Sequence, residues 1–323
     1  MEQSNIQIRL ANISDVEQIN SLLQRNAPQY LRDHAYWLWI HRLIGCDSSI
    51  SVVADIGQKI IGHYAIIPTE IWIKEKVYPA GLGIHALVDK QYNVSILDIS
   101  KMAYEEAEKK GLKFIYGFPN KNYRLIQEKL ERWKKIALFN AYEFSSNIET
   151  TLPENLTCVP VENNYDSLFN LGKLLELGYK NKCNRIKKNI QYYYFRYLNH
   201  PQKLYDVFFI YLREKLVGCL FMKKFIAENG DTRLHLVDFL RTEDLSYSQI
   251  IQFCKYYANQ AGIKSISIWP IHVEFEQELN VQGFAPVGFD TFFGIKLLDN
   301  EWNQQDIFNF ENWELMMGDS DAI

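Results

Sequence analysis

The pattern of apolar and polar positions predicts a mixed α/β fold from the start of the chain. Residues 6–10 alternate as a β-strand does. Ser14 and Glu17 then have the spacing of a capping box, and the apolar residues that follow recur at helical intervals. The first strand is therefore expected to lead directly into a helix.

Five strands and two helices are expected in the rest of the first half. Pro68 is expected to close the first hairpin, Ser95 to cap the next helix and Gly111 to end it. The strands are expected at residues 51–54, 60–67, 71–78 and 83–88, and they are followed by a helix from 95 to 110, a strand at 113–117 and a helix at 122–133.

The second half repeats this order about 150 residues later. Residues 59–63 resemble 215–219, and residues 111–115 resemble 262–266. Offsets of this size are typical of a duplicated domain rather than of a short repeat. We therefore expect an α/β chain of two similar domains, each a mixed, mostly antiparallel sheet flanked by helices. Their expected ranges are 1–150 and 151–300, with a tail at 301–323.

Composition narrows the function. The 323 residues include 35 Lys and Arg against 39 Asp and Glu, which argues against a broad nucleic-acid-binding surface. Five cysteines are dispersed without a CxxC pair, so we expect reduced thiols, no metal site and a cytoplasmic location. The polar start lacks the apolar stretch of a signal peptide, and the apolar runs are too short to span a bilayer.

Four segments carry a resemblance to a known family. They are Tyr-Trp-Leu-Trp at 36–39, Ile-Gly-His-Tyr at 61–64 followed by Pro68, Tyr-Gly-Phe-Pro-Asn at 116–120, and the ending from Trp313 through Gly-Asp-Ser-Asp at 318–321. Together they resemble GNAT-superfamily N-acyltransferases of the tandem-domain type found with polysaccharide and amino-sugar biosynthesis genes. The resemblance implies two GNAT-like domains and acetyl-CoA or another acyl-CoA as co-substrate, with no metal.

The same resemblance implies where the acyl-CoA binds. Its pyrophosphate loop aligns with residues 91–97, but the glycines that normally bring backbone N–H groups to the phosphates are absent. Residues 241–246 of the second half are no closer to that motif, so the first half is the better candidate. The implied cofactor contacts are Leu87, Tyr92, Asn93, Val94, Ser95 and Ile96.

Two residues are candidates for proton transfer. His85 lies in the expected fourth strand, and its ordinary pKa near 6.5 suits a general base at neutral pH. The alternative for His85 is a hydrogen-bonded core histidine. Tyr123 occupies the approximate position of the family's general acid, whereas a packing role is the alternative for any one of 20 tyrosines.

Five further residues are candidates for binding the substrate. His63 lies one strand from His85. Asn120 either binds the substrate or caps the following helix. Asp238 lies in an apolar strand, where a carboxylate needs a partner: a structural ion pair or a substrate amine. Asp319 and Asp321 belong to the tail that the resemblance places near the cleft.

Three functions remain open at this stage. The first is acyl-CoA-dependent N-acylation of an amino sugar, nucleotide-linked, in bacterial surface-glycan biosynthesis. The second is a degenerate GNAT-like module that binds a ligand or a protein without turnover. The third is a Fem-like transferase that uses aminoacyl-tRNA, against which the absence of a basic stripe counts. The expected partner is a small molecule, and a homodimer is left open.

Overall fold

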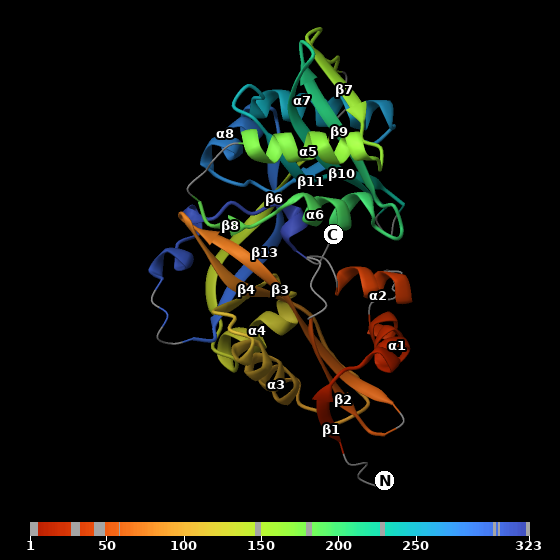
Figure 1. Cartoon of the computed structure of the whole chain (residues 1–323), viewed down its shortest axis with the longest axis vertical. Coiled ribbons are helices and arrows are strands. Elements are labelled where there is room, and N and C mark those ends of the chain that lie inside the picture. Colours follow the sequence, from red (N-terminus) through yellow and green to blue (C-terminus); the bar gives the residue numbers. More distant parts are fainter. Residues whose placement is uncertain are drawn as a thin grey trace. The chain divides into compact units, whose positions relative to one another are not determined.

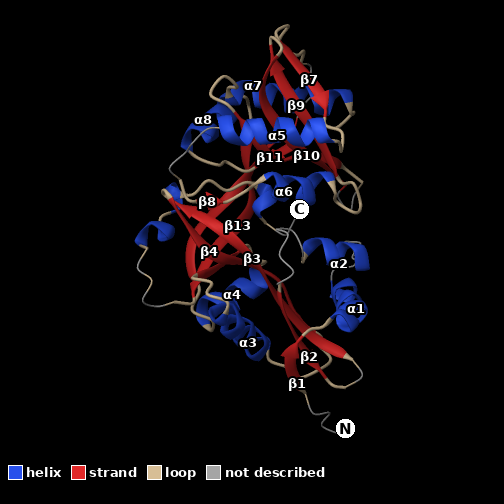
Figure 2. Cartoon of the chain, in the orientation of Figure 1, coloured by secondary structure: helices blue, strands red, loops and turns tan. Residues whose placement is uncertain are grey.

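The computed structural model describes residues 6–26, 33–41, 49–57, 59–145, 150–178, 183–226, 230–299, 302 and 304–320. The chain divides into two compact units (Figures 1 and 2). The N-terminal unit is Met1–Ala137 with Phe292–Phe310, and the C-terminal unit is Leu138–Thr291 with Glu311–Ile323. Each unit is described by itself below.

The N-terminal unit contains a sheet in the order β1-β2-β3-β4-β5-β13. Every neighbouring pair is antiparallel except β4 and β5, which are parallel. The strands are β1 (Gln7–Leu10), β2 (Ile50–Asp55), β3 (Ile60–Ile73), β4 (Lys76–Val88), β5 (Phe114–Gly117) and the end of β13 (Ala285–Leu297).

Helices cover both faces of this sheet. Along β2, Val53 packs against the apolar side of α1, whereas Val52 and Ala54 pack against α3. Because successive strand residues point to opposite faces, α1 and α3 lie on opposite sides of the sheet. The helical segments are η1 (Ile13–Asp15), α1 (Val16–Asn26), α2 (His34–Ile40), α3 (Ile96–Lys109), α4 (Lys121–Lys129) and η3 (Gln305–Phe308).

The C-terminal unit contains a sheet in the order β7-β9-β10-β11-β12-β6. Among the strand pairs that the structure describes there, β11 and β12 are parallel and the others antiparallel. Along β10, Cys219 and Phe221 pack against α5 and α6, while Leu220 and Met222 pack against α7 and α8. The strands are β6 (Lys134–Ser145), β7 (Leu156–Pro160), β8 (Arg185–Ile186), β9 (Tyr205–Leu212), β10 (Lys215–Ile226), β11 (Thr232–Arg241) and β12 (Ser265–Ile268).

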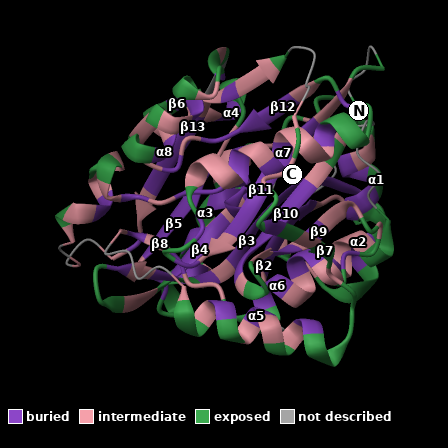
Figure 3. Cartoon of the chain, turned by 90° about the horizontal axis from the view of Figure 1, so that it is seen from above, coloured by how far each residue is buried: buried purple, intermediate pink, exposed green. Residues whose placement is uncertain are grey.

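The helical segments of this unit follow the same succession as those of the first. They are α5 (Tyr165–Leu177), α6 (Ile190–Tyr193), the π-helical turn η2 (Tyr194–Leu198), α7 (Tyr247–Gln260), α8 (Val273–Val281) and η5 (Met317–Asp319); the short η4 (Phe310–Asn312) begins at the last residue of the N-terminal unit. In both units the strands are largely buried and the outer sides of the helices are exposed (Figure 3). The predicted fold class, α/β with mixed and mostly antiparallel sheets flanked by helices, is confirmed.

In each unit, one strand of the sheet follows a helix of the other unit in the sequence. Residues 142–145 of β6 follow α4 along the chain, yet they pair with β12. Residues 294–297 of β13 follow α8, yet they pair with β5. The compact units therefore change at Ala137 and Phe292, whereas the sequence-based ranges 1–150, 151–300 and 301–323 stay a prediction about the ancestral duplication.

Two local expectations are wrong. Pro68 does not close a hairpin: β3 runs on to Ile73 and pairs with β4 along its whole length, so the strands expected at 71–78 and 83–88 are parts of one longer hairpin. β2 pairs with β3 only as far as Ile66, so Pro68, which lacks an N–H, interrupts no bond to β2.

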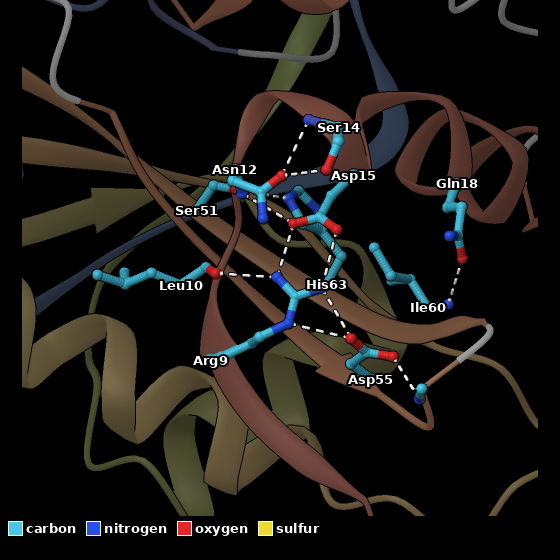
Figure 4. Close-up of polar contacts among 11 residues, drawn as sticks. Arg9, Leu10, Asn12, Ser14, Asp15, Gln18, Ser51, Asp55, Ile60 and His63 are labelled. Carbon is cyan, nitrogen blue, oxygen red and sulfur yellow. Dashed lines mark hydrogen bonds and ion pairs between the residues drawn. The ribbon is translucent and has the colours of Figure 1, made fainter.

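The first helix also begins differently. The capping box is formed by Asn12 and Asp15, not by Ser14 and Glu17. Asp15 is held in place by Arg9 of β1, whose guanidinium binds Asp15 at 2.7 Å and Asp55 of β2 at 2.7 Å (Figure 4). This arginine fixes the first strand, the start of the helix and the end of β2 in one network.

No helix among the described residues is both long and apolar enough to cross a membrane. Within those same residues, no group of three or more His, Cys, Asp or Glu side chains is arranged to hold a metal ion.

Candidate functional site

The strand β4 is interrupted by a bulge at His85. His63 pairs with Leu87 and Ala65 pairs with Ile84, so two residues of β4, His85 and Ala86, face one of β3. His85 has φ of +54°, a left-handed conformation that is uncommon for a residue with a side chain. Such local strain persists only when the surroundings hold it, and it is concentrated at functional sites.

The β4–β5 ladder ends just before this bulge. The last described pair is Leu82 with Tyr116, while β4 continues to Val88. Gly83 is the first residue beyond the ladder, and a Cβ there would lie 2.5 Å from the Tyr64 hydroxyl. Glycine thus lets Tyr64 approach the backbone where β4 leaves β5.

Three buried histidines meet on the face of the sheet that α1 and α2 cover. His63 of β3, His85 of β4 and His41, which ends α2, have ring centroids 6.0 to 6.4 Å apart. Ser51 lies 2.9 Å from Nε2 of His63, and Ser49 lies 2.8 Å from Nδ1 of His41. The sequence-predicted pair His63 and His85 is therefore brought together, and His41 is a neighbour that the prediction missed.

Burial keeps His41 neutral. Removal from water lowers the pKa of His41 to about 3, and the adjacent His63 ring contributes in the same direction. At neutral pH, His41 therefore acts as a hydrogen-bonding group and not as a proton carrier. Its ring stacks on Trp37 with centroids 4.1 Å apart.

The start of α3 lies beyond the end of β4. Ser95 caps the helix, with its Oγ accepting from Leu97 N–H at 3.2 Å. Asp89, just after β4, binds Lys59 at 3.0 Å and lies 3.7 Å from Arg25. The backbone N–H of Gln91 and the ammonium of Lys59 lower the pKa of Asp89 below its ordinary value. Two cations, Lys59 and Arg25, thus face the carboxylate of Asp89.

The remaining predicted contacts of this loop lie at the same place. The Lys59 ammonium lies over the Tyr92 ring, 4.7 Å from the centroid of that ring. Asn93 and Ser95 are exposed, whereas Val94 and Ile96 are partly buried against the α3 core. Leu87 pairs with His63 at the bulge.

The equivalent position of the C-terminal unit is closed. Ser246 and Gln249 form a full capping box at the start of α7, which occupies backbone N–H groups of both residues. Asp244 just before it pairs with Lys215 at 2.6 Å. Acidic residues flank both helix starts, Glu243 and Asp244 before α7 and Asp98 in the first turn of α3, so it is the full capping box of α7 that makes the start of α3 the more open of the two.

Tyr123 belongs to a buried network around Glu131. The Glu131 carboxylate accepts from Tyr123 Oη at 3.0 Å, Tyr104 Oη at 2.7 Å and Ser100 Oγ at 2.5 Å. Burial raises the pKa of Tyr123 above its ordinary value, so its phenol stays protonated. Asn120 accepts from Tyr123 N–H at 3.0 Å and caps α4, which is the capping role that the sequence left open.

Asp238 and Asp319 meet in the C-terminal unit. Lys188 Nζ lies 2.8 Å from Asp238 and 2.7 Å from Asp319, and Tyr197 Oη donates to Asp238 at 2.8 Å. Burial opposes the charge on Lys188, but the two carboxylates outweigh it and raise its pKa well above the ordinary value. An ammonium of the chain itself thus occupies both carboxylates. Asp321 lies outside the described residues.

Several of these partners give no signal in the sequence. Lys188 and Glu131 lie 50 and 31 residues along the chain from the groups they bind, Asp238 and Ser100. For His41 the sequence does contain a signal, because this residue follows the aromatic segment 36–39 and lies at a helical interval from Trp37. Nothing in the spacing, however, indicated that this helix would face His63.

Comparison with solved structures places the fold. The chain is similar to a probable N-acyltransferase from Enterococcus faecalis V583, with a TM-score of 0.68 and 11% identity over 91% of this chain and 73% of that one. It is also similar to Saccharomyces cerevisiae N-myristoyltransferase with bound myristoyl-CoA, with a TM-score of 0.62 and 11% identity over 91% and 79%.

A third similar structure is a GCN5-related glucosamine N-acetyltransferase region of a fungal multi-domain β-N-acetylglucosaminidase. Its TM-score is 0.62 with 11% identity, over 90% of this chain and 38% of that one. No family model and no curated protein matches the chain. The chain therefore shares its fold with these acyltransferase structures, which is the fold that the sequence resemblance implied.

The lysine between two aspartates generates a stability prediction. Lys188→Met leaves two buried carboxylates without a cation, so we expect the free energy of unfolding in urea to fall by about 3–5 kcal/mol. Lys215→Met, in the exposed pair with Asp244, is the matched control and is expected to cost less than about 1 kcal/mol. Equal losses in the two variants would contradict this assignment.

The neutral His41 generates a pH prediction. The unfolded chain binds a proton at this histidine below its ordinary pKa near 6.5, whereas the folded chain does not until about pH 3. Stability must therefore fall as pH drops through this window, by up to about 1.4 kcal/mol per pH unit for each such group. His41→Gln should lower the slope of unfolding free energy against pH between 5.5 and 4.5. An unchanged slope would show that His41 is charged in the folded protein.

Proposed function

We propose that the N-terminal unit transfers an acyl group from acyl-CoA to the amine of an amino sugar, nucleotide-linked, in bacterial surface-glycan biosynthesis. The observation that carries this proposal is the bulge of β4. It puts the strained His85 where the strand leaves β5, and the same strand leads into the start of α3. A proton acceptor and a phosphate-binding helix end are thus parts of one continuous segment.

The start of α3 has features that attract a pyrophosphate. The helix dipole favours an anion, and the ammonium of Lys59 lies over Tyr92 in the loop before the helix, whereas Asp89 and Asp98 oppose an anion there. Because the loop lacks glycines, its side chains hinder an anion from approaching the backbone N–H groups. We therefore assign the attraction to the helix end and to the side chains around Asn93 and Ser95.

The bulge supplies the groups for acyl transfer. In the proposed reaction the amine nitrogen forms a bond to the thioester carbonyl carbon, and His85 accepts the proton that the amine loses. A backbone N–H of the interrupted strand stabilises the carbonyl oxygen as it gains negative charge. The C–S bond then breaks, and the thiolate takes the proton that His85 has accepted. Tyr123, the acid expected from the sequence, donates its hydroxyl hydrogen to Glu131, and burial keeps its phenol protonated.

Three observations support an amino sugar as the acceptor. The segments that resemble amino-sugar enzymes include the aromatic run of α2, which lies beside His85: the Tyr36 ring centroid is 6.5 Å from that of His85. One structure with a similar fold is a glucosamine N-acetyltransferase region. The side chains around His85 include hydroxyl and imidazole groups able to form hydrogen bonds, and His41 is neutral, which suits a polyhydroxylated acceptor.

The second candidate is binding without turnover. It is favoured by the loop, which lacks glycines, and by Ser95, which already occupies the Leu97 N–H. Acyl-CoA binding without transfer to any amine would distinguish it from the leading proposal.

Ser95→Glu tests the cofactor site. A carboxylate at the start of α3 opposes a pyrophosphate, so we expect calorimetry to show acetyl-CoA binding weakened at least tenfold, or about 1.4 kcal/mol. Ser246→Glu places the same charge at the start of α7 and is expected to leave binding unchanged. Equal effects of the two substitutions, or no binding to the unsubstituted protein, would count against a site at α3.

His85→Asn tests the proton acceptor. Asparagine tolerates the left-handed backbone of this position, so the bulge is expected to survive. We expect kcat/KM for glucosamine acetylation to fall roughly 100- to 10,000-fold, with acetyl-CoA affinity unchanged. His34→Asn, at an exposed residue of α2, is the control. If the variant keeps its activity and its pH profile, another group takes the proton.

A further inference from the structure

Two nitrogen atoms on the α2 segment are buried without a hydrogen-bond partner among the described residues. They are Nε1 of Trp37 and Nε2 of His41. The two rings stack, with centroids 4.1 Å apart and planes at 23°. Buried polar groups are paired in most proteins because an unpaired one costs free energy, so two on one stacked pair require an explanation.

Their surroundings belong to the proposed acceptor site. The His41 ring centroid is 6.3 Å from that of His85 and 6.4 Å from that of His63. Trp37 packs on the same face of the sheet, against the cluster formed by α1, β2 and β3. A group bound at these nitrogens would therefore be a close neighbour of a group bound at His85.

The chemistry of the two nitrogens limits what they bind. The Trp37 indole only donates a hydrogen bond, which excludes an ammonium as its partner. His41 is neutral and already shares Nδ1 with Ser49, so its Nε2 donates or accepts according to the tautomer. A carboxylate would draw a proton onto His41, which its burial opposes. A hydroxyl both accepts and donates, and it fits Trp37 together with either tautomer of His41.

We propose that Trp37 Nε1 and His41 Nε2 bind a hydroxyl group that neighbours the reacting amine, and so select amino alcohols of the sugar type over amines without hydroxyls. This inference rests on the proposed function of the N-terminal unit. It assigns to α2 the recognition of the acceptor, while His85 takes the proton.

Trp37→Phe tests the assignment, because it removes the N–H and keeps an aromatic ring on His41. Acetyl transfer is measured to glucosamine and to cyclohexylamine, a ring amine without hydroxyls. We expect kcat/KM for glucosamine to fall about 10- to 100-fold, through KM, and that for cyclohexylamine to change less than about twofold.

Trp302→Phe is the matched control. Its Nε1 is also buried without a partner among the described residues, but its ring packs on Phe114 and Tyr78, away from the histidines. It is expected to leave both rates unchanged. If Trp37→Phe lowers kcat/KM equally for both amines, or for neither, Trp37 does not bind a hydroxyl group of the acceptor and the inference is overturned.

A binding measurement separates this inference from the proposed function. Glucosamine is titrated calorimetrically into the unsubstituted protein and into Trp37→Phe, without an acyl donor. If no amine is acetylated but the substitution still weakens glucosamine binding tenfold or more, the proposed function fails and the hydroxyl site stands. If both proteins bind glucosamine equally while transfer occurs, the function stands and the hydroxyl site fails.

Discussion

The interruption of β4 is the constraint on which the candidate site depends. One extra residue on this strand turns the backbone of His85 into a conformation that L-residues avoid. β4 pairs with β5 from Ala80 to Leu82 and no longer does so at the bulge, where the polar side chains of β3 and α2 gather. In a regular strand, the backbone N–H at this place would be bonded within the sheet. It could then not donate to a reactive carbonyl group.

The histidines around the bulge show how burial sets chemical roles. Removal from water lowers the pKa of His41, and the adjacent His63 adds to this effect. His41 is therefore a fixed hydrogen-bonding group, whereas the proposed reaction gives the proton transfer to His85.

The sequence was sufficient for the order of elements and for part of the site. The periodicity located α3 and its Ser95 cap, because short-range signals determine these features. It misplaced the β3–β4 hairpin, because a proline is harmless where the neighbouring strand has ended. His63 and His85 were found on adjacent strands, but the Glu131 and Lys188 networks were not, since their partners are brought together only by the fold.

The way in which each sheet is completed bears on how the protein is made. β5 acquires its outer neighbour only from residues 294–297, although the rest of its sheet is encoded before residue 118. During synthesis, β5 therefore waits for nearly the whole remaining chain with one edge open. An open edge of apolar strand is a template for pairing with other chains. The nascent protein is thus most exposed to aggregation while its second half is on the ribosome, and a gene fragment cut near the middle inherits that exposed edge permanently.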